Sequence, residues 1–247
     1  MMSLARTSSG DIVKRQYAFK LKAHIDSYSS LVGIQMLALL FSFGGVGSMG
    51  SYGDGLNLEV KYYSSDLVLV FTAIWAFVTA TTLTTRPYRN HDFTFVSNRL
   101  TSSLSNILFL ASISLAGALT AMLAGNLLKV FVFIFADGPI YNQGTGLADL
   151  AAGTVIALFY LFLVTSAGYL IGSLVQVSKL FVILIPVVFF GSLFLDAVAN
   201  REPIVNNVFQ FYIMESSLLL LMVKTLITSA ALLAAAVAIL NRLEVRR

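Results

Sequence analysis

The stretch that decides the fold is DLVLVFTAIWAFVTATTLTTRPYRNHDFTFVSNRLTSSLSNILFLASISLAGALTAML, residues 66–123. Its two ends are apolar, and its middle, residues 81–106, gathers three arginines, a histidine, an aspartate and a proline. A helix needs roughly 20 apolar residues to cross a bilayer. The stretch therefore predicts two membrane-spanning helices joined by a short polar loop.

Composition extends this prediction to the whole chain. Of 247 residues, 57% are hydrophobic and only 11% are charged, against about 25% in ordinary globular proteins. The net charge of +4 comes from basic residues at the ends of apolar runs, not from a basic patch, which argues against a nucleic-acid partner. Because the chain has no cysteine, disulfides, thiolate metal sites and cysteine nucleophiles are excluded.

The apolar runs predict an all-α, polytopic membrane protein. We expect a cytoplasmic N-terminal segment over residues 1–30, a transmembrane domain over residues 31–240 and a cytoplasmic tail over residues 241–247. The third apolar run continues to about Phe135, and Asn126 and Lys129 suggest a membrane exit with an interfacial or tilted extension beyond it. The six predicted spans are residues 31–47, 67–83, 104–128, 147–175, 180–199 and 217–240.

Basic residues predict the orientation, because lysine and arginine near span ends are retained on the cytoplasmic side. Six spans place both termini on one side of the membrane. Four basic residues, Lys61, Lys129, Arg201 and Lys224, fall on the opposite side or in the outer half of a span. The other 12 of the 16 fall on the side of the termini: Arg6, Lys14, Arg15, Lys20, Lys22, Arg86, Arg89, Arg99, Lys179, Arg242, Arg246 and Arg247. We therefore expect both termini on the cytoplasmic side of the membrane.

The N-terminal segment DIVKRQYAFKLKAHIDSY, residues 11–28, mixes apolar and aromatic residues with lysine and arginine. This pattern predicts a basic amphipathic helix in the headgroup plane. The alternative, a disordered basic tail, rarely carries so many aromatic residues.

The polar loop after the second span has two interpretations. It is either a turn with cytoplasmic arginines or a short helix that docks onto a partner. Pro87 ends the second span, and Asn90 and Asp92 are suitable N-cap residues for such a helix. Its apolar face would consist of Phe93, Val96 and Leu100.

Polar residues within or beside the spans are the other candidate site residues, since burying them in lipid is costly. Lys224 is either an interfacial anchor or a contact to a cavity or partner, and Glu215 and Asp149 either pair with lysines or line an outer vestibule. Gly168 and Gly172 form a GxxxG pair, which predicts close helix packing. The connection from Phe190 to Ser216 mixes apolar and polar residues, and we expect it to enter the outer leaflet partway and return.

No catalytic, cofactor or metal residues are predicted. The chain has no GxxxxGK[ST] phosphate loop and no HExxH, and its histidines, His24 and His91, lie far apart in the sequence. We therefore do not expect it to be an enzyme by itself.

Together these features resemble a known family. An amphipathic first helix, six spans, the RPYRNHDFTFVSNRLTSS segment between spans two and three, and a polar connection between spans five and six look like the permease subunit of a bacterial ABC transporter of the type-2 exporter class. The length is similar to that of peptide-exporter permeases and also to that of permeases for small drug or sodium extrusion. The resemblance implies a place in the plasma membrane of a bacterial cell.

The resemblance implies a function and its partners. The permease would form the path for a hydrophobic or amphipathic peptide, lipid or drug, as a dimer with a second copy or a paralogue. A separate ATPase subunit would bind ATP and magnesium and contact the loop through Arg86, Arg89, Asp92, Phe93, Val96, Arg99 and Leu100. The alternative is a six-span membrane scaffold, immunity or sensor protein that does not transport.

Overall fold

The structure is a computed structural model that describes residues 9–53, 56–88, 98–135, 146–199, 201, 203–215 and 217–242. Within them, six helices are long and apolar enough to cross a membrane. The chain is therefore a multi-pass membrane protein built mainly of helices, as the sequence predicts. The six are α2 (Ile25–Phe43), α3 (Asp66–Leu83), α5 (Arg99–Phe135), α6 (Leu147–Val177), α7 (Phe181–Val198) and α9 (Leu218–Arg242).

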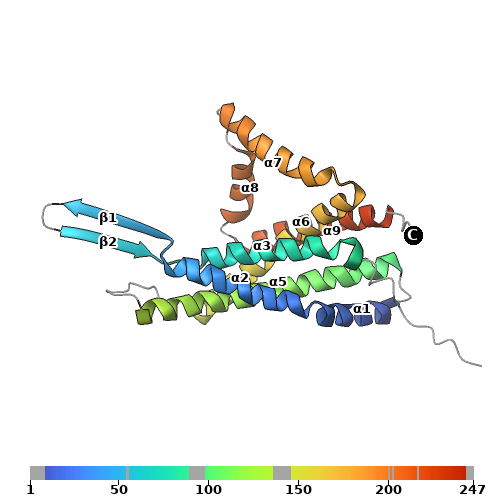
Figure 1. The fold of residues 1–247 in the computed structure, drawn as a ribbon, viewed down its shortest axis with the longest axis horizontal. Helices are drawn as coiled ribbons and strands as arrows, with labels where there is room; N and C mark the ends of the chain where they lie inside the picture. Colours follow the sequence, from blue (N-terminus) through green and yellow to red (C-terminus); the bar gives the residue numbers. More distant parts are fainter. Residues whose placement is uncertain are drawn as a thin grey trace, which may run out of the picture.

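Helices α2, α3, α5, α6 and α9 form an elongated bundle, and α1 (Ser9–Ala23) lies against one end of α5 (Figure 1). Helix α6 contacts α3, α5 and α9, so it holds the two sides of the bundle together. The main core lies at these contacts and includes Trp75, Phe109, Leu161 and Tyr169. Because the first described helix and the end of α9 lie at the same end of the bundle, we refer to this as the terminal end.

The α3–α6 contact depends on the two glycines of the GxxxG pair. A Cβ atom at Gly168 would lie 2.8 Å from the carbonyl oxygen of Phe77, and one at Gly172 would lie 3.0 Å from the Cα of Thr81. The first separation is too short for a Cβ atom and the second is unusually tight, and in both cases the opposing atom belongs to the backbone of α3. Small residues let transmembrane helices approach this closely.

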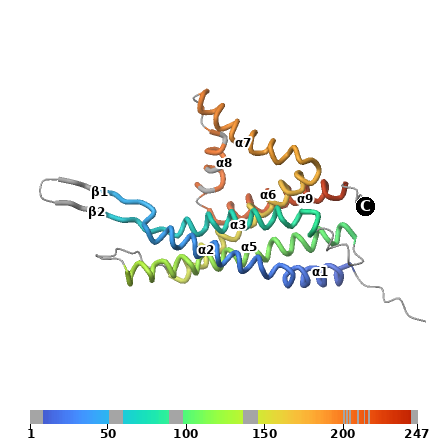
Figure 2. Tube along the Cα trace, in the orientation of Figure 1, coloured from blue at the N-terminus to red at the C-terminus, as the bar shows by residue number. Residues whose placement is uncertain are grey.

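A β-hairpin extends from the other end of the bundle, and the all-α prediction did not include it (Figures 1 and 2). Strand β1 (Gly47–Gly53) pairs antiparallel with β2 (Leu56–Tyr62), with Gly47 opposite Tyr62. Gly45, with a φ of 91°, makes the turn out of α2 in a conformation that favours glycine. The first span was predicted to reach residue 47, but the helix ends at Phe43 because this turn begins there.

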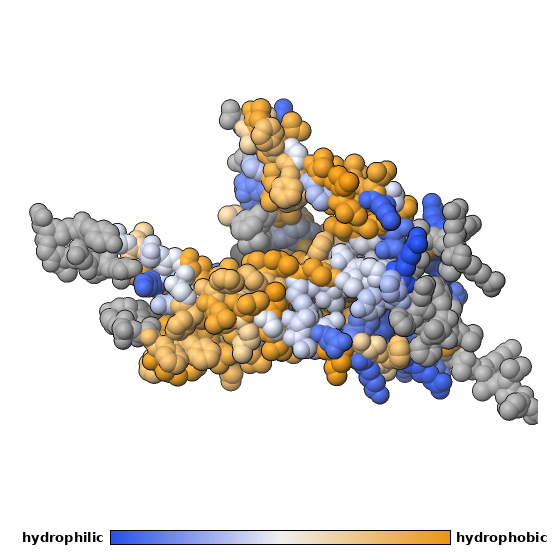
Figure 3. Space-filling model, viewed as in Figure 1, coloured by the Kyte–Doolittle hydropathy of each residue, from blue (hydrophilic) through white to orange (hydrophobic). Residues whose placement is uncertain are grey.

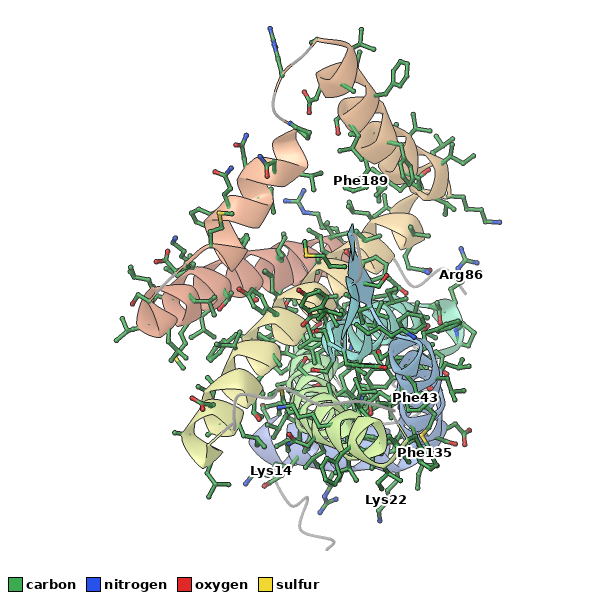
Figure 4. The ribbon with its side chains drawn as sticks, turned by 90° about the vertical axis from the view of Figure 1, so that its left-hand side faces the viewer. Lys14, Lys22, Phe43, Arg86, Phe135 and Phe189 are labelled. Atoms are coloured by element: carbon green, nitrogen blue, oxygen red, sulfur yellow. The ribbon has the colours of Figure 1, made fainter. Side chains whose placement is uncertain are left out.

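Helix α5 is continuous for 37 residues, about 55 Å at 1.5 Å per residue. It therefore includes the predicted third span and the extension to Phe135 in one helix. Near the hairpin, the ring of Phe135 meets that of Phe43 edge to face, with centroids 6.2 Å apart (Figure 4).

Helices α7 and α8 (Ile204–Ile213) stand away from the bundle as a V (Figures 1 and 2). No residue of α7 is buried, and its exposed side chains are almost all apolar. Figure 3 shows the same hydrophobic surface over α7 and along the middle of the bundle, while hydrophilic atoms gather at the terminal end. An apolar surface of this extent is suited to lipid or to another membrane helix.

Candidate functional site

A buried polar seam joins α1 to α5 at the terminal end. Gln16, Lys20 and His24 follow each other at intervals of four residues, so they share one helical face, and all three are buried. The facing turns of α5 supply Ser102, Ser105 and Asn106, which are also buried. Helix α1 therefore turns polar side chains inward, and we call these six residues the α1–α5 polar seam.

Lys20 is the centre of this seam and is only 3% exposed. Its Nζ donates hydrogen bonds to Ser105 Oγ at 2.8 Å, to Asn106 Oδ1 and, more weakly, to the Ser102 carbonyl at 3.4 Å. Asn106 Nδ2 in turn donates to the hydroxyl of Tyr169 on α6, at 3.1 Å. These bonds connect α1, α5 and α6 through one chain of polar groups.

His24 marks the junction of α1 and α2. Its Nδ1 donates to the carbonyl oxygen of Lys20 at 2.9 Å, and its ring lies between the rings of Tyr88 and Phe109, with centroid distances of 5.0 and 4.7 Å. The sequence predicts no role for His24 and places Lys20 on an amphipathic helix in the headgroup plane. The structure places both in the interior, and the signal for this was the four-residue spacing of Gln16, Lys20 and His24.

A pocket of about 360 Å³ opens beside His24, between α2 and α3. Trp75 lines the pocket and donates from Nε1 to Ser30 Oγ at 2.9 Å, which joins α3 to α2. The residues that line the pocket are His24, Ser27, Ser30, Ile34, Ile74, Trp75, Val78, Thr79, Thr82, Leu83 and Tyr88. Its volume lies in the range of small-molecule sites.

A second polar cluster ties α8 to the bundle. Lys224 on α9 forms an ion pair with Glu215, and its Nζ lies 4.3 Å from the ring centroid of Phe211 and 3.4 Å from the carbonyl oxygen of Phe211. Tyr160 on α6 adds a hydrogen bond of 2.7 Å to the carbonyl oxygen of Tyr212. The hydrogen bond from Lys224 lowers the pKa of Glu215, which lies between α8 and α9 outside the spans.

Asp149 does not share this cluster. Its Oδ2 accepts a hydrogen bond of 3.0 Å from the Gly146 amide, so it caps the exposed start of α6. A carboxylate at this position also interacts favourably with the helix dipole. Of the two proposed vestibule carboxylates, the structure brings only Glu215 to Lys224.

The predicted ATPase-coupling residues are described in part. Arg86 is exposed and points away from the bundle (Figure 4), and Leu100 is 55% exposed. Arg99 Nη1 donates to the carbonyl oxygen of Asn241 at 2.6 Å, which joins the start of α5 to the end of α9. Arg89, Asp92, Phe93 and Val96 lie outside the described residues.

Basic side chains gather at the terminal end. Lys14 and Lys22 extend from α1 away from the bundle, and Arg86 extends from the end of α3 (Figure 4). Among the described residues, no group of three or more His, Asp or Glu side chains is placed to hold a metal ion. The chemistry of this end is thus that of a cationic surface over a buried polar seam.

Comparisons with family models, with curated proteins and with solved structures find no match to this chain.

Proposed function

We propose that this chain is the permease subunit of an ATP-driven ABC exporter in the bacterial plasma membrane, driven by a separate ATPase subunit. The observation that carries the proposal is the order of helices: α1, two apolar helices with the β-hairpin between them, the 84–98 connection, three apolar helices, then α8 and a last apolar helix. This order agrees with the arrangement that the sequence resemblance implies.

The terminal end is where the ATPase would bind. Three apolar-helix ends meet there, those of α3, α5 and α9, and the Arg99–Asn241 hydrogen bond links two of them. The α1–α5 polar seam lies directly beneath, and Tyr169 extends it to α6. A displacement of the connection between α3 and α5 by the ATPase would therefore be transmitted to α1 and α6 through these hydrogen bonds.

The other moving part of the proposal is the α7–α8 pair. Because α7 has no buried residue, it needs an apolar partner, and a second permease copy supplies one along with lipid. Helix α8 is held to the bundle by the Lys224–Glu215 pair and the Tyr160–Tyr212 contact. In this function α8 is the outer re-entrant helix that closes the path of a hydrophobic or amphipathic substrate.

The test is co-purification with any ATP-binding cassette protein that is encoded beside this gene. Phe93→Ser, Val96→Ser and Leu100→Ser together should abolish co-purification and leave membrane insertion intact. Leu100→Ser and Leu104→Ser are a matched pair, since both leucines are exposed and lie one turn apart on α5. Leu100→Ser alone should weaken capture of the ATPase, and Leu104→Ser should not.

A second measurement identifies the class of substrate that is transported. Once the complex is purified, its ATP hydrolysis is measured with candidate peptides, lipids and drugs, and the transported class should stimulate it. An unchanged capture by the triple variant would contradict the proposal. A gene with no neighbouring ATP-binding cassette would favour the scaffold, immunity or sensor alternative.

A further inference from the structure

The pocket between α2 and α3 changes character along its length. Beyond His24, the lining residues Ser27, Ser30 and Ile34 lie on successive turns of α2, going away from the terminal end. On α3, Tyr88 follows the helix at the same end and Ile74 lies deeper. Ten residues separate His24 from Ile34, about 15 Å along a helix. The pocket therefore has His24, Ser27 and Tyr88 at the terminal end, and Ile34, Ile74 and Trp75 farther into the bundle.

The mouth of the pocket faces the surface that lipid would cover. Ile74 and Val78, which line it, are themselves more than half exposed. On α2, Leu37 follows Ile34 by one turn on the same face and is also exposed, so the rim is apolar on both helices. Water has no access to such a rim in a membrane, and a ligand would enter from the bilayer.

Charge at the polar end favours an anion. Arg86 lies two residues before Tyr88 and is exposed, and Lys22 is exposed two residues before His24. Asp26, exposed next to Ser27, opposes them, which leaves the cations in excess among these three residues. Basic side chains near the membrane surface attract anionic lipid headgroups.

We propose that this pocket binds one anionic phospholipid, with its phosphate at the His24–Tyr88 end and an acyl chain along Ile34 and Ile74. The pocket holds the headgroup, the glycerol and the upper part of a chain, and the remaining lipid lies on the apolar rim. The hydroxyls of Ser27 and Tyr88 are the donors available to phosphate oxygens. The proposal requires that α2 and α3 span the membrane and does not rest on the permease function.

The first experiment separates a bound lipid from the lipid that surrounds any membrane protein. The full chain is placed in phosphatidylcholine nanodiscs that contain a rising fraction of phosphatidylglycerol with a photoactivatable acyl chain, and labelled peptides are mapped by mass spectrometry. Labelling of residues 27–34 and 74–82 should saturate at a low fraction, while labelling of α7 should rise in proportion to it. Proportional labelling at both places would overturn the proposal.

The second experiment uses variants. Thr79→Phe fills the pocket and should remove the saturable labelling. Arg86→Gln should raise the half-saturating lipid fraction about five-fold. This factor corresponds to the loss of about 1 kcal/mol of binding free energy, which is typical of one basic residue near an anionic membrane surface. Asp26→Asn should lower the half-saturating fraction, and Lys14→Gln, an exposed cation on α1 that does not line the pocket, should leave it unchanged.

Two further arms make each outcome decisive. If gel filtration shows that Thr79→Phe does not fold, the half-saturating lipid fractions of Arg86→Gln and Asp26→Asn still test the proposal, because they should shift in opposite directions. Shifts in the same direction would contradict the preference for an anionic lipid. Excess soluble glycerol phosphate should leave the labelling unchanged. If it abolishes the labelling, the site binds a free phosphate compound and the phospholipid proposal is wrong.

Discussion

Lys20 on α1 donates a hydrogen bond of 2.8 Å to Ser105 on α5, and both side chains are buried. A lysine this deeply buried is uncommon, because removing its charge from water is costly unless hydrogen bonds compensate. Ser105 and Asn106 provide that compensation, and Asn106 is held in turn by Tyr169. The pairing fixes α1 against the bundle instead of leaving it free on the membrane surface.

The first prediction follows from this pairing. Lys20→Met should lower the thermal stability of the detergent-purified chain, by about 1–3 kcal/mol, because Ser105 and Asn106 lose their donor while buried. Lys22→Met is the matched control, since Lys22 is exposed two residues away on the same helix. Melting followed by size-exclusion fluorescence measures both. Equal melting temperatures for the two variants would show that the seam contributes nothing to stability.

The second prediction concerns the close approach of α3 and α6. Gly168→Ala should destabilise the bundle by about 1–3 kcal/mol, because the new methyl group meets the Phe77 carbonyl and the helices must move apart. Gly191→Ala on α7 is the control, since nothing lies within 4 Å of a Cβ at that position. The same melting measurement applies. A Gly168→Ala variant as stable as Gly191→Ala would mean that α3 and α6 pack less closely than the structure has them.

The number and the approximate positions of the spanning helices could be predicted from the sequence, because they depend on hydropathy. Each of the six apolar runs became a helix, because an apolar segment of spanning length satisfies its own backbone only as a helix. The ends were less predictable. The first spanning helix, α2, begins at Ile25, ahead of the apolar run that starts at residue 31. It begins there because His24 forms the junction with α1 and packs against Tyr88 and Phe109.

The hairpin and the polar seam were missed for different reasons. Leu56, Leu58, Val60 and Tyr62 alternate with polar residues, and Asp54-Gly55 is a common hairpin dipeptide, so a sequence signal for the hairpin existed. The seam had a weaker signal, because a lysine among basic neighbours is ordinarily a solvated charge. The four-residue spacing places Lys20, and not Lys22, on the face of Gln16 and His24, but the contacts with Ser102, Ser105 and Asn106 are needed to show that this face is buried.

The third prediction concerns pH and the attachment of α8. The pKa of Glu215 is lowered from its ordinary value of 4.5, mainly by the hydrogen bond from Lys224. A lowered carboxyl pKa contributes stability above 4.5 and loses it as the pH falls through the lowered value. Hydrogen exchange of the α8 amides should therefore be constant above that range and faster below it, relative to the intrinsic rate.

Lys224→Met is the control for this prediction. Without the lysine, the carboxyl keeps only the backbone hydrogen bond from Ser217, so α8 should exchange faster at neutral pH and show a smaller further change on acidification. Glu215→Gln should behave in the same way. If α8 in the unaltered chain keeps its protection down to low pH, the ion pair does not hold it to the bundle, and the Tyr160–Tyr212 hydrogen bond is sufficient.

The last prediction concerns the orientation of the chain in the membrane. The permease proposal depends on it, and so does the leaflet from which the proposed phospholipid would bind. The terminal end carries Lys14, Lys22, Arg86, Arg99 and Arg242, and the hairpin lies at the opposite end (Figures 1 and 3). Inverting the chain would take these charges across the bilayer, at about 2.5–3.5 kcal/mol for each one on insertion scales. We therefore expect the terminal end in the cytoplasm.

Single cysteines in this cysteine-free chain test the orientation directly with a membrane-impermeant thiol reagent on whole cells. Three positions should react from outside and three only after permeabilisation: Ser51, Thr145 and Asn206 in the first group, and Ser9, Asn90 and Glu244 in the second. The two groups control each other, since every variant has one added thiol and the same reagent. Reaction of Asn90 in intact cells would place the connection between α3 and α5 outside, where no ATP-driven subunit can reach it, and the permease proposal would then be wrong.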